Sequence, residues 1–144
     1  MKTMELTLTR TIPATPEEVY DVWIDPKSPG SPWFGISRAI VQPRVDGLFY
    51  HVVLFEGHDW AHYGRFVALL RPYRIEHTWV SEATRGLESV VSLTFETHDN
   101  ATVVTLLHTN LPDDDMGRRH NEGWGFVLDS IVSRFVQKPT EQNS

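Results

Sequence analysis

DDDMGRRHNEGWGFVLDSIVSRF, residues 113–135, is a long amphipathic segment that decides the fold of the chain. Three aspartates at its start place negative charge where the dipole of a helix favours it. Apolar and ring side chains recur at three- and four-residue spacing, as on one face of an α-helix; they are Met116, His120, Trp124, Val127, Leu128, Ile131 and Phe135. The segment therefore predicts a long helix with one face directed at the rest of the protein.

The first part of the chain predicts one strand and two short helices. Apolar and polar residues alternate over residues 3–12, which indicates a strand. Thr15, Pro16 and Glu18 then have the spacing of a capping box, so a short helix is expected to begin there. Residues 25–35 are dense in proline and glycine and favour a broken second helix or turn, with Trp33 and Phe34 pointing inward.

The middle of the chain reads as strands separated by short turns. We expect strands over residues 36–42, 47–55, 60–70, 73–80, 89–97 and 101–109. Short connections favour an antiparallel meander, and the final helix is the one element large enough to cover a face of it. The predicted fold class is α+β: a curved antiparallel sheet of about seven strands wrapped around a long C-terminal helix, with two short helices after the first strand.

Composition limits the function classes. We expect residues 1–138 to form a single domain and residues 139–144 a polar tail. The formal net charge is −6 and no basic run occurs, so no nucleic acid and no membrane is expected as a partner. There is no cysteine, which excludes thiolate chemistry. The N-terminus lacks the apolar run of a signal peptide, so the expected location is cytoplasmic.

Several short motifs, in order, resemble one known family. They are Arg10 to Tyr20 (RTIPATPEEVY), Trp33-Phe34-Gly35, Val45-Asp46-Gly47, Gly64-Arg65-Phe66, Pro72 to Trp79 (PYRIEHTW), His108-Thr109 and Gly123-Trp124. Together with the order of elements, they resemble the START-like, or helix-grip, superfamily, also called SRPBCC. Within it, the chain is similar to the branch related to the C-terminal domain of the activator of heat shock protein 90 ATPase.

The resemblance implies three function classes. Most single-domain relatives look like small-molecule binding proteins, and some superfamily members are polyketide cyclases or aromatases. The eukaryotic activators carry a further N-terminal domain that docks on the chaperone, for which this chain has no room. A small apolar or aromatic ligand is therefore the leading expectation. A cyclase- or hydrolase-like enzyme using a cavity histidine, and a chaperone ATPase regulator, are the alternatives.

Strand alternation predicts which residues line the space beneath the helix. His51, His62, His77 and His108 share a face with apolar neighbours, and we expect two or three of these histidines inside. Histidine can orient a polar group or act as acid and base. The candidate ligand-binding residues are Trp33, Phe49, His51, Phe66, His77, Trp79, Phe95, Leu106, His108, Trp124 and Leu128.

Gly123 and Gly125 flank Trp124, although glycine disfavours a helix interior by about 0.8–1 kcal/mol relative to alanine. Either the helix bends or allows a close backbone approach, with Trp124 as the roof of a cavity, or it packs tightly on the sheet without a ligand. Phe126 lies on the side of the predicted helix opposite to Trp124, where an exposed phenylalanine is compatible with a homodimer contact.

Other chemistry finds little support in the sequence. Glu56, His58, Asp59 and His62 lie at the tip of a predicted hairpin, where charged side chains are usually solvated, so no metal site is expected. Catalytic and nucleotide-binding motifs are missing, so we expect no cofactor and assign no catalytic residue.

Overall fold

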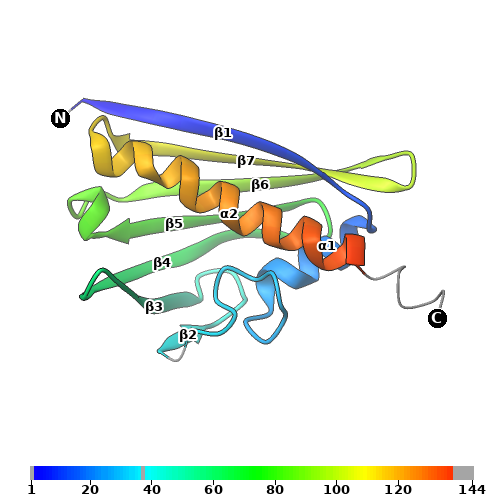
Figure 1. Cartoon of the computed structure of the whole chain (residues 1–144), viewed down its shortest axis with the longest axis horizontal. Coiled ribbons are helices and arrows are strands. Elements are labelled where there is room, and N and C mark those ends of the chain that lie inside the picture. Colours follow the sequence, from blue (N-terminus) through cyan, green and yellow to red (C-terminus); the bar gives the residue numbers. More distant parts are fainter. Residues whose placement is uncertain (1, 37, 138–144) are drawn as a thin grey trace.

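The computed structural model describes residues 2–36 and 38–137 and has an α+β architecture (Figure 1). Its strands are β1 (Thr3–Ile12), β2 (Ala39–Val41), β3 (Leu48–Phe55), β4 (His58–Leu70), β5 (Arg74–Ser81), β6 (Ser89–His98) and β7 (Ala101–Pro112). Its helices are α1 (Pro16–Ile24), a 3-10 turn η1 (Glu82–Thr84) and α2 (Asp115–Gln137). The predicted fold class is confirmed, except that one short helix follows β1 instead of two. The predicted tail, residues 139–144, lies outside the described residues.

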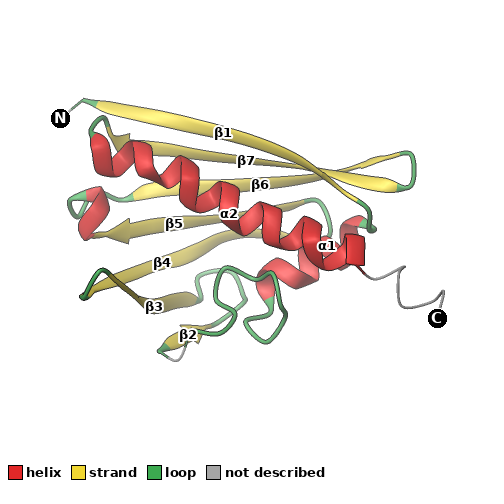
Figure 2. Ribbon diagram, in the orientation of Figure 1, coloured by secondary structure: helices red, strands yellow, loops and turns green. Residues whose placement is uncertain are grey.

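The seven strands form one antiparallel sheet in the order β1-β7-β6-β5-β4-β3-β2. Strands β2 to β7 follow one another as the predicted meander, and β1 pairs with β7, for example at Leu8 and Leu106. The predicted strand over residues 36–42 is shorter, since β2 covers three residues. The predicted last strand is longer and ends at Pro112. Figure 2 shows α2 lying across one face of this sheet.

Helix α1 begins where its sequence predicts. The Thr15 hydroxyl accepts from the backbone N–H of Glu18, and the Glu18 carboxylate accepts from the N–H of Thr15, so the capping box is formed. Asp25 ends the helix. Among the described residues between Asp25 and β2, successive turns replace the predicted second helix (Figure 2).

The turns after α1 have a local cause. Gly30 has φ +103°, a conformation that a helix does not contain. The Ser31 hydroxyl donates to the carbonyl of Trp23 and accepts from the N–H of Trp33, which fixes Trp33 inward at 1% exposure. Phe34 was also expected to point inward, and this prediction is wrong, because its side chain is 48% exposed. The ring of Trp33 therefore lies in the core and the ring of Phe34 lies at the surface.

Helix α2 lies mainly against β1. The Arg10 guanidinium of β1 meets the Asp129 carboxylate of α2 at 2.7 Å. On the predicted inner face Trp124, Leu128, Ile131 and Phe135 are buried, whereas Met116, His120 and Val127 are half-buried. The helix thus covers the β1 side of the sheet more closely than the β3 side, which leaves space between the helix and β3.

No helix among the described residues is long and apolar enough to cross a membrane.

Candidate functional site

An open cleft of about 2040 Å³ runs between α2, the β3–β4 hairpin and the loop that follows α1. Several apolar side chains on its surface are substantially exposed, including Phe34, Val53, Phe55 and Phe126. The wall also contains His51, Trp60, His62, Trp79, Met116, His120, Gly123, Trp124 and Val127. The cleft is therefore lined mainly by apolar and ring side chains.

Three of the eleven predicted ligand-binding residues line this cleft: His51, Trp79 and Trp124. The other eight are buried in the core: Trp33, Phe49, Phe66, His77, Phe95, Leu106, His108 and Leu128. Their contact with a ligand stays a prediction. The sheet and α2 thus enclose packed side chains over most of their contact, and the space opens at the hairpin side.

Ring contacts fill the region where a central hollow was expected. The Phe49 ring lies 5.1 Å from the His77 ring and 5.3 Å from the Trp33 ring, measured between centroids. Phe66 lies 5.7 Å from His77. Edge-on and tilted contacts of this kind are favourable for aromatic pairs. These rings act as a rigid support for the cleft wall formed by Trp79 and His51.

All four histidines predicted to share the inner face do so. His77 and His108 are fully buried, His51 is 3% exposed, and His62 is half-buried with its ring stacked on His51 at 4.6 Å. The alternation in β3, β4, β5 and β7 was therefore read in the correct register. Only His51 and His62 of these four lie at the cleft, and His120 of α2 joins them.

His108 is the centre of a hydrogen-bonded chain beneath Trp124. The indole Nε1–H of Trp124 donates to Nδ1 of His108 at 2.9 Å, so the neutral ring carries its proton on Nε2. That Nε2–H donates to the Ser89 hydroxyl at 2.8 Å, and the hydroxyl donates to the carbonyl of Trp79. Both nitrogens of His108 are engaged, which makes it a positioning residue for two cleft rings, Trp79 and Trp124.

Burial keeps these histidines uncharged. Burial and then the neighbouring His62 lower the pKa of His51 to about 3. Burial, with His120 nearby, lowers the pKa of His62 to about 4. Burial lowers the pKa of His77 to about 4 and, helped by His120, that of His108 to about 2. At neutral pH the wall therefore presents imidazole rings without positive charge.

Four nitrogens on cleft residues have no hydrogen-bond partner within the described part of the chain. They are Nδ1 of His51, Nδ1 of His62, Nε1 of Trp60 and Nε1 of Trp79. Leaving a buried polar atom unpaired is unfavourable by about 1–3 kcal/mol. Nε1 of Trp23, Nε1 of Trp33 and Nε2 of His77 in the core are unpaired in the same way, so this feature does not distinguish the cleft wall from the core.

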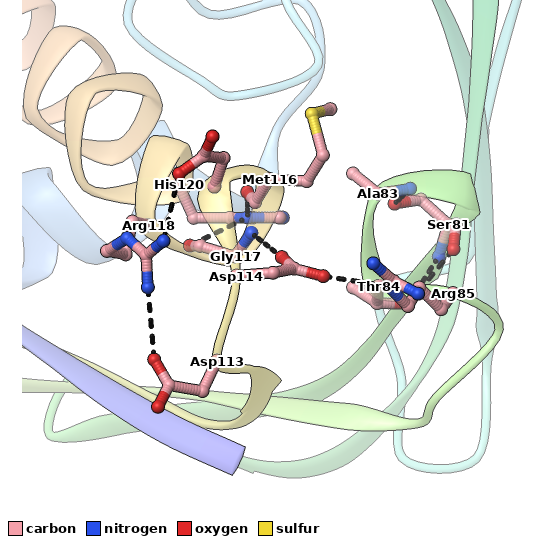
Figure 3. A network of polar contacts seen from close by, with 11 residues as sticks. Ser81, Ala83, Thr84, Arg85, Asp113, Asp114, Met116, Gly117, Arg118 and His120 are labelled. Carbon is pink, nitrogen blue, oxygen red and sulfur yellow. Dashed lines mark hydrogen bonds and ion pairs between the residues drawn. The ribbon is translucent and has the colours of Figure 1, made fainter. Parts of the chain in front are cut away.

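η1 and the first turns of α2 contribute to the cleft lining through Ala83, Met116 and His120. The Asp114 carboxylate accepts from the N–H of Gly117 at 2.8 Å and from the Arg85 guanidinium at 2.7 Å, which ties α2 to the turn after β5 (Figure 3). His120 donates from Nδ1 to the carbonyl of Met116. These contacts fix the first turns of α2, from which Met116 and His120 reach the cleft.

Gly123 lies on the cleft side of α2. A Cβ atom built there would meet no protein atom within 4 Å, so neither tight packing on the sheet nor a close backbone approach explains this glycine. Trp124, in contrast, is 4% exposed and its ring lies 4.8 Å from Trp79 and 5.6 Å from Trp23. The tryptophan therefore forms a wall of the cleft beside a patch of bare helix backbone.

The sequence reasoning did not select several cleft residues. Val53, Phe55 and Trp60 follow the same alternation as the selected residues of β3 and β4, and they approach the hairpin tip, where exposure was expected. His120 belongs to the predicted inner face of α2. The strand and helix patterns of the sequence therefore contain these residues, but they do not show that the cleft lies at the side of the β3–β4 hairpin.

In the described part of the chain, no group of three or more His, Asp or Glu residues could hold a metal ion.

A comparison with protein families now identifies the chain. The family model described as Activator of Hsp90 ATPase homolog 1-like protein matches residues 13–135. The chain belongs to this family. The match covers β2 to β7, α1, all but the last two residues of α2 and every residue of the cleft lining, so the branch of the START-like superfamily inferred from the short motifs is confirmed.

Solved structures of this Activator of Hsp90 ATPase homolog 1-like fold agree with the architecture. Protein CV1439 from Chromobacterium violaceum is 20% identical, with a TM-score of 0.78 over 91% of this chain and 96% of that one. PFC0360w, an HSP90 activator from Plasmodium falciparum, is 24% identical, with a TM-score of 0.68 over 84% and 87%. The Aha1 dimer from Colwellia psychrerythraea is 20% identical, with a TM-score of 0.71 over 92% and 96%. At these identities the likeness concerns the fold. A comparison with curated proteins finds no matching sequence.

Proposed function

We propose that this Activator of Hsp90 ATPase homolog 1-like protein binds a small apolar or aromatic molecule in the cleft between α2 and the β3–β4 hairpin. The observation that carries the proposal is the concentration of exposed apolar side chains in that cleft, among them Val53, Phe55 and Phe126. Exposed apolar groups gathered in a concave site are typical of ligand binding. Typical ligand pockets measure about 300–1,000 Å³, so one such molecule would occupy part of the cleft.

Binding is favoured over turnover by the state of the histidines. A general base works best when its pKa lies near the working pH. Burial lowers the pKa values of His51 and His62 to about 3 and about 4, so both are weak bases. His108 already uses both ring nitrogens. The cavity-histidine enzyme is therefore the less supported alternative.

Two substitutions on the same strand test the proposal. Val53 lines the cleft and is 37% exposed, whereas its neighbour Leu54 is outside the cleft lining and is 71% exposed. Native mass spectrometry of protein that has been unfolded, refolded and incubated with an extract of its source cells should reveal a bound small molecule. Val53→Glu should abolish the adduct and Leu54→Glu should retain it. No adduct, or equal loss in both variants, would overturn the proposal.

A chaperone regulator is the second candidate. Family membership and the fold shared with the Plasmodium falciparum HSP90 activator support it. Addition of the purified chain should then raise the ATPase rate of a purified Hsp90 from the same source. An unchanged rate at saturating protein would exclude this function.

A homodimer is a further proposal, supported by the dimeric Colwellia psychrerythraea relative. On the outer face of the sheet, Tyr50 pairs with Tyr63, and both side chains are more than 40% exposed beside Ile40. Sedimentation over a hundredfold concentration range should show a dimer that Tyr63→Glu weakens. A monomer throughout would refute the assembly.

A further inference from the structure

Among the described residues of α2, Gly123 is the glycine that lies in the cleft lining, and it is exposed. It lies in the cleft lining with His120, Trp124 and Val127, which are one turn or less away along the helix. Glycine is, after proline, the least favourable residue in a helix interior. Gly123 has no positive φ that would require glycine, and a Cβ atom there would meet open space. Neither backbone conformation nor packing within the protein therefore accounts for the residue.

The other two glycines of α2 have different surroundings. At Gly117 a Cβ atom would lie 1.9 Å from the carbonyl oxygen of Pro112, so packing accounts for this glycine. Gly125 faces β1, where a Cβ atom would make ordinary contacts of 3.6 Å with Arg10 and 3.8 Å with Leu8. Gly125 is thus a matched neighbour of Gly123 that lies in the same helix but outside the cleft lining.

Ring side chains without charge form part of the same cleft lining as Gly123. The indole of Trp79 lies 4.8 Å from that of Trp124 and 4.9 Å from the imidazole of His62, which in turn stacks on His51. Burial lowers the pKa values of both histidines well below neutral pH. Flat rings attract other flat rings through offset or edge contacts. A planar aromatic group is therefore the shape and chemistry that this wall favours.

The rim of the cleft disfavours an anion. Two guanidinium groups border it, and Arg134 already donates to the carbonyl of Pro29. Arg119 has no ion pair with another described residue, and Arg134 keeps its positive charge because its partner is a neutral carbonyl. Five carboxylates lie along the cleft, those of Glu18, Asp21, Glu56, Glu122 and Asp129. Two of them, Asp21 and Asp129, form ion pairs with Arg71 and Arg10, which lie outside the cleft lining. With a chain charge of −6, an anionic ligand would be repelled as it approached.

We propose that the ligand is an uncharged molecule with a planar aromatic ring system, and that this ring system lies against the backbone of α2 at Gly123. The inference rests on the proposed binding function and specifies its ligand class and the residue that makes room for it. A methyl group at Gly123 would then occupy space that the ligand needs, although the protein itself leaves that space open.

A pair of fluorescent probes and a pair of variants test the inference. N-phenylnaphthylamine is an uncharged planar aromatic amine, and anilinonaphthalenesulfonate has the same ring system with an added sulfonate. Both are titrated into the full chain, into Gly123→Ala and into Gly125→Ala. Thermal unfolding of each variant is measured in parallel, because either alanine should raise Tm by about 2–4 °C through its helix propensity.

The affinities of the two probes for the three proteins test separately the role of Gly123, the uncharged ligand class and the binding function. N-phenylnaphthylamine should bind the natural chain, bind Gly125→Ala equally well, and bind Gly123→Ala about fivefold or more weakly, although both variants are at least as stable. The sulfonate probe should bind the natural chain about tenfold or more weakly than the uncharged probe. Equal affinity of the uncharged probe for all three proteins would overturn the assignment of Gly123. Equal affinity of both probes would overturn the uncharged class. Failure of the natural chain to bind either probe would overturn the proposed function as well.

Discussion

Lowering the pH from 7.5 to 5.5 should destabilise the protein strongly, because its core contains uncharged histidines. His77 and His108 are fully buried and His51 is 3% exposed. Burial, as the main cause, lowers their pKa values to about 4, about 2 and about 3, respectively. In the unfolded chain the same rings have the ordinary pKa of about 6.5. At a pH between the folded and unfolded pKa values, these histidines are protonated in the unfolded chain and neutral in the folded protein.

The sign and size of the effect follow from linkage. The stability contributed by these neutral rings is fully present above pH 6.5 and is lost as the pH falls below it, down to the folded-state pKa of each ring. One pH unit below 6.5, each of these three histidines lowers the free energy of unfolding by about 1.4 kcal/mol. His62, whose pKa burial lowers to about 4, adds a similar loss, so the four together lower the free energy by about 5–6 kcal/mol. Domains are stable by about 5–15 kcal/mol, so this loss is a large fraction of the total.

Urea unfolding followed by tryptophan fluorescence, repeated at intervals between pH 7.5 and 5.5, measures this dependence. His77→Leu should reduce the slope of unfolding free energy against pH by about one quarter, because one of the four rings with a strongly lowered pKa is removed. His98 is exposed, so His98→Gln serves as the control substitution of a histidine outside the core. A free energy of unfolding that stays constant between pH 6.5 and 5.5, or an equal effect of both substitutions, would refute the reasoning.

Three further substitutions test the packing around the cleft. Gly64→Ala should destabilise the fold by about 1–3 kcal/mol or prevent folding, because its Cβ atom would lie 2.5 Å from the Phe49 ring; a normal urea midpoint would contradict this. Trp124→Phe should lower the free energy of unfolding by about 1–3 kcal/mol, since it leaves Nδ1 of His108 without its donor; denaturant unfolding that matches the natural chain would count against the hydrogen-bonded chain. Thr15→Ala should remove the N-cap of α1 and lower stability by about 1 kcal/mol, and an unchanged Tm would argue against the cap.

Much of the fold could be predicted because its signals are local. The cap at Thr15 and the alternation that brings His51 and His77 to the inner face depend only on residues near each other in sequence. The prediction of a second helix after α1 was wrong. The hydrogen bond from the Ser31 hydroxyl to the carbonyl of Trp23 and the positive φ of Gly30 determine the conformation of that loop, and neither is visible in the spacing of apolar residues.

The position of the cleft could not be predicted, because it depends on how far α2 is displaced across the sheet. Contacts between distant segments set this displacement, such as the ion pair of Arg10 with Asp129 and the approach of Gly30 to Ile131. Alternation identifies an inward side chain but does not say whether the space beyond it is filled. Alternation therefore selected His77 and Phe66 as ligand-binding candidates together with His51, although neither His77 nor Phe66 lies in the cleft lining.

The indole N–H signals of the five tryptophans give the most direct test of a ligand-binding cleft between α2 and the β3–β4 hairpin. Trp60, Trp79 and Trp124 line the cleft, whereas Trp23 and Trp33 lie in the core behind it. Titration of the isotope-labelled protein with N-phenylnaphthylamine, followed by heteronuclear NMR, should shift the first three signals and leave the other two nearly in place. Shifts confined to Trp23 and Trp33, or no shift at saturating probe, would contradict a binding site in this cleft.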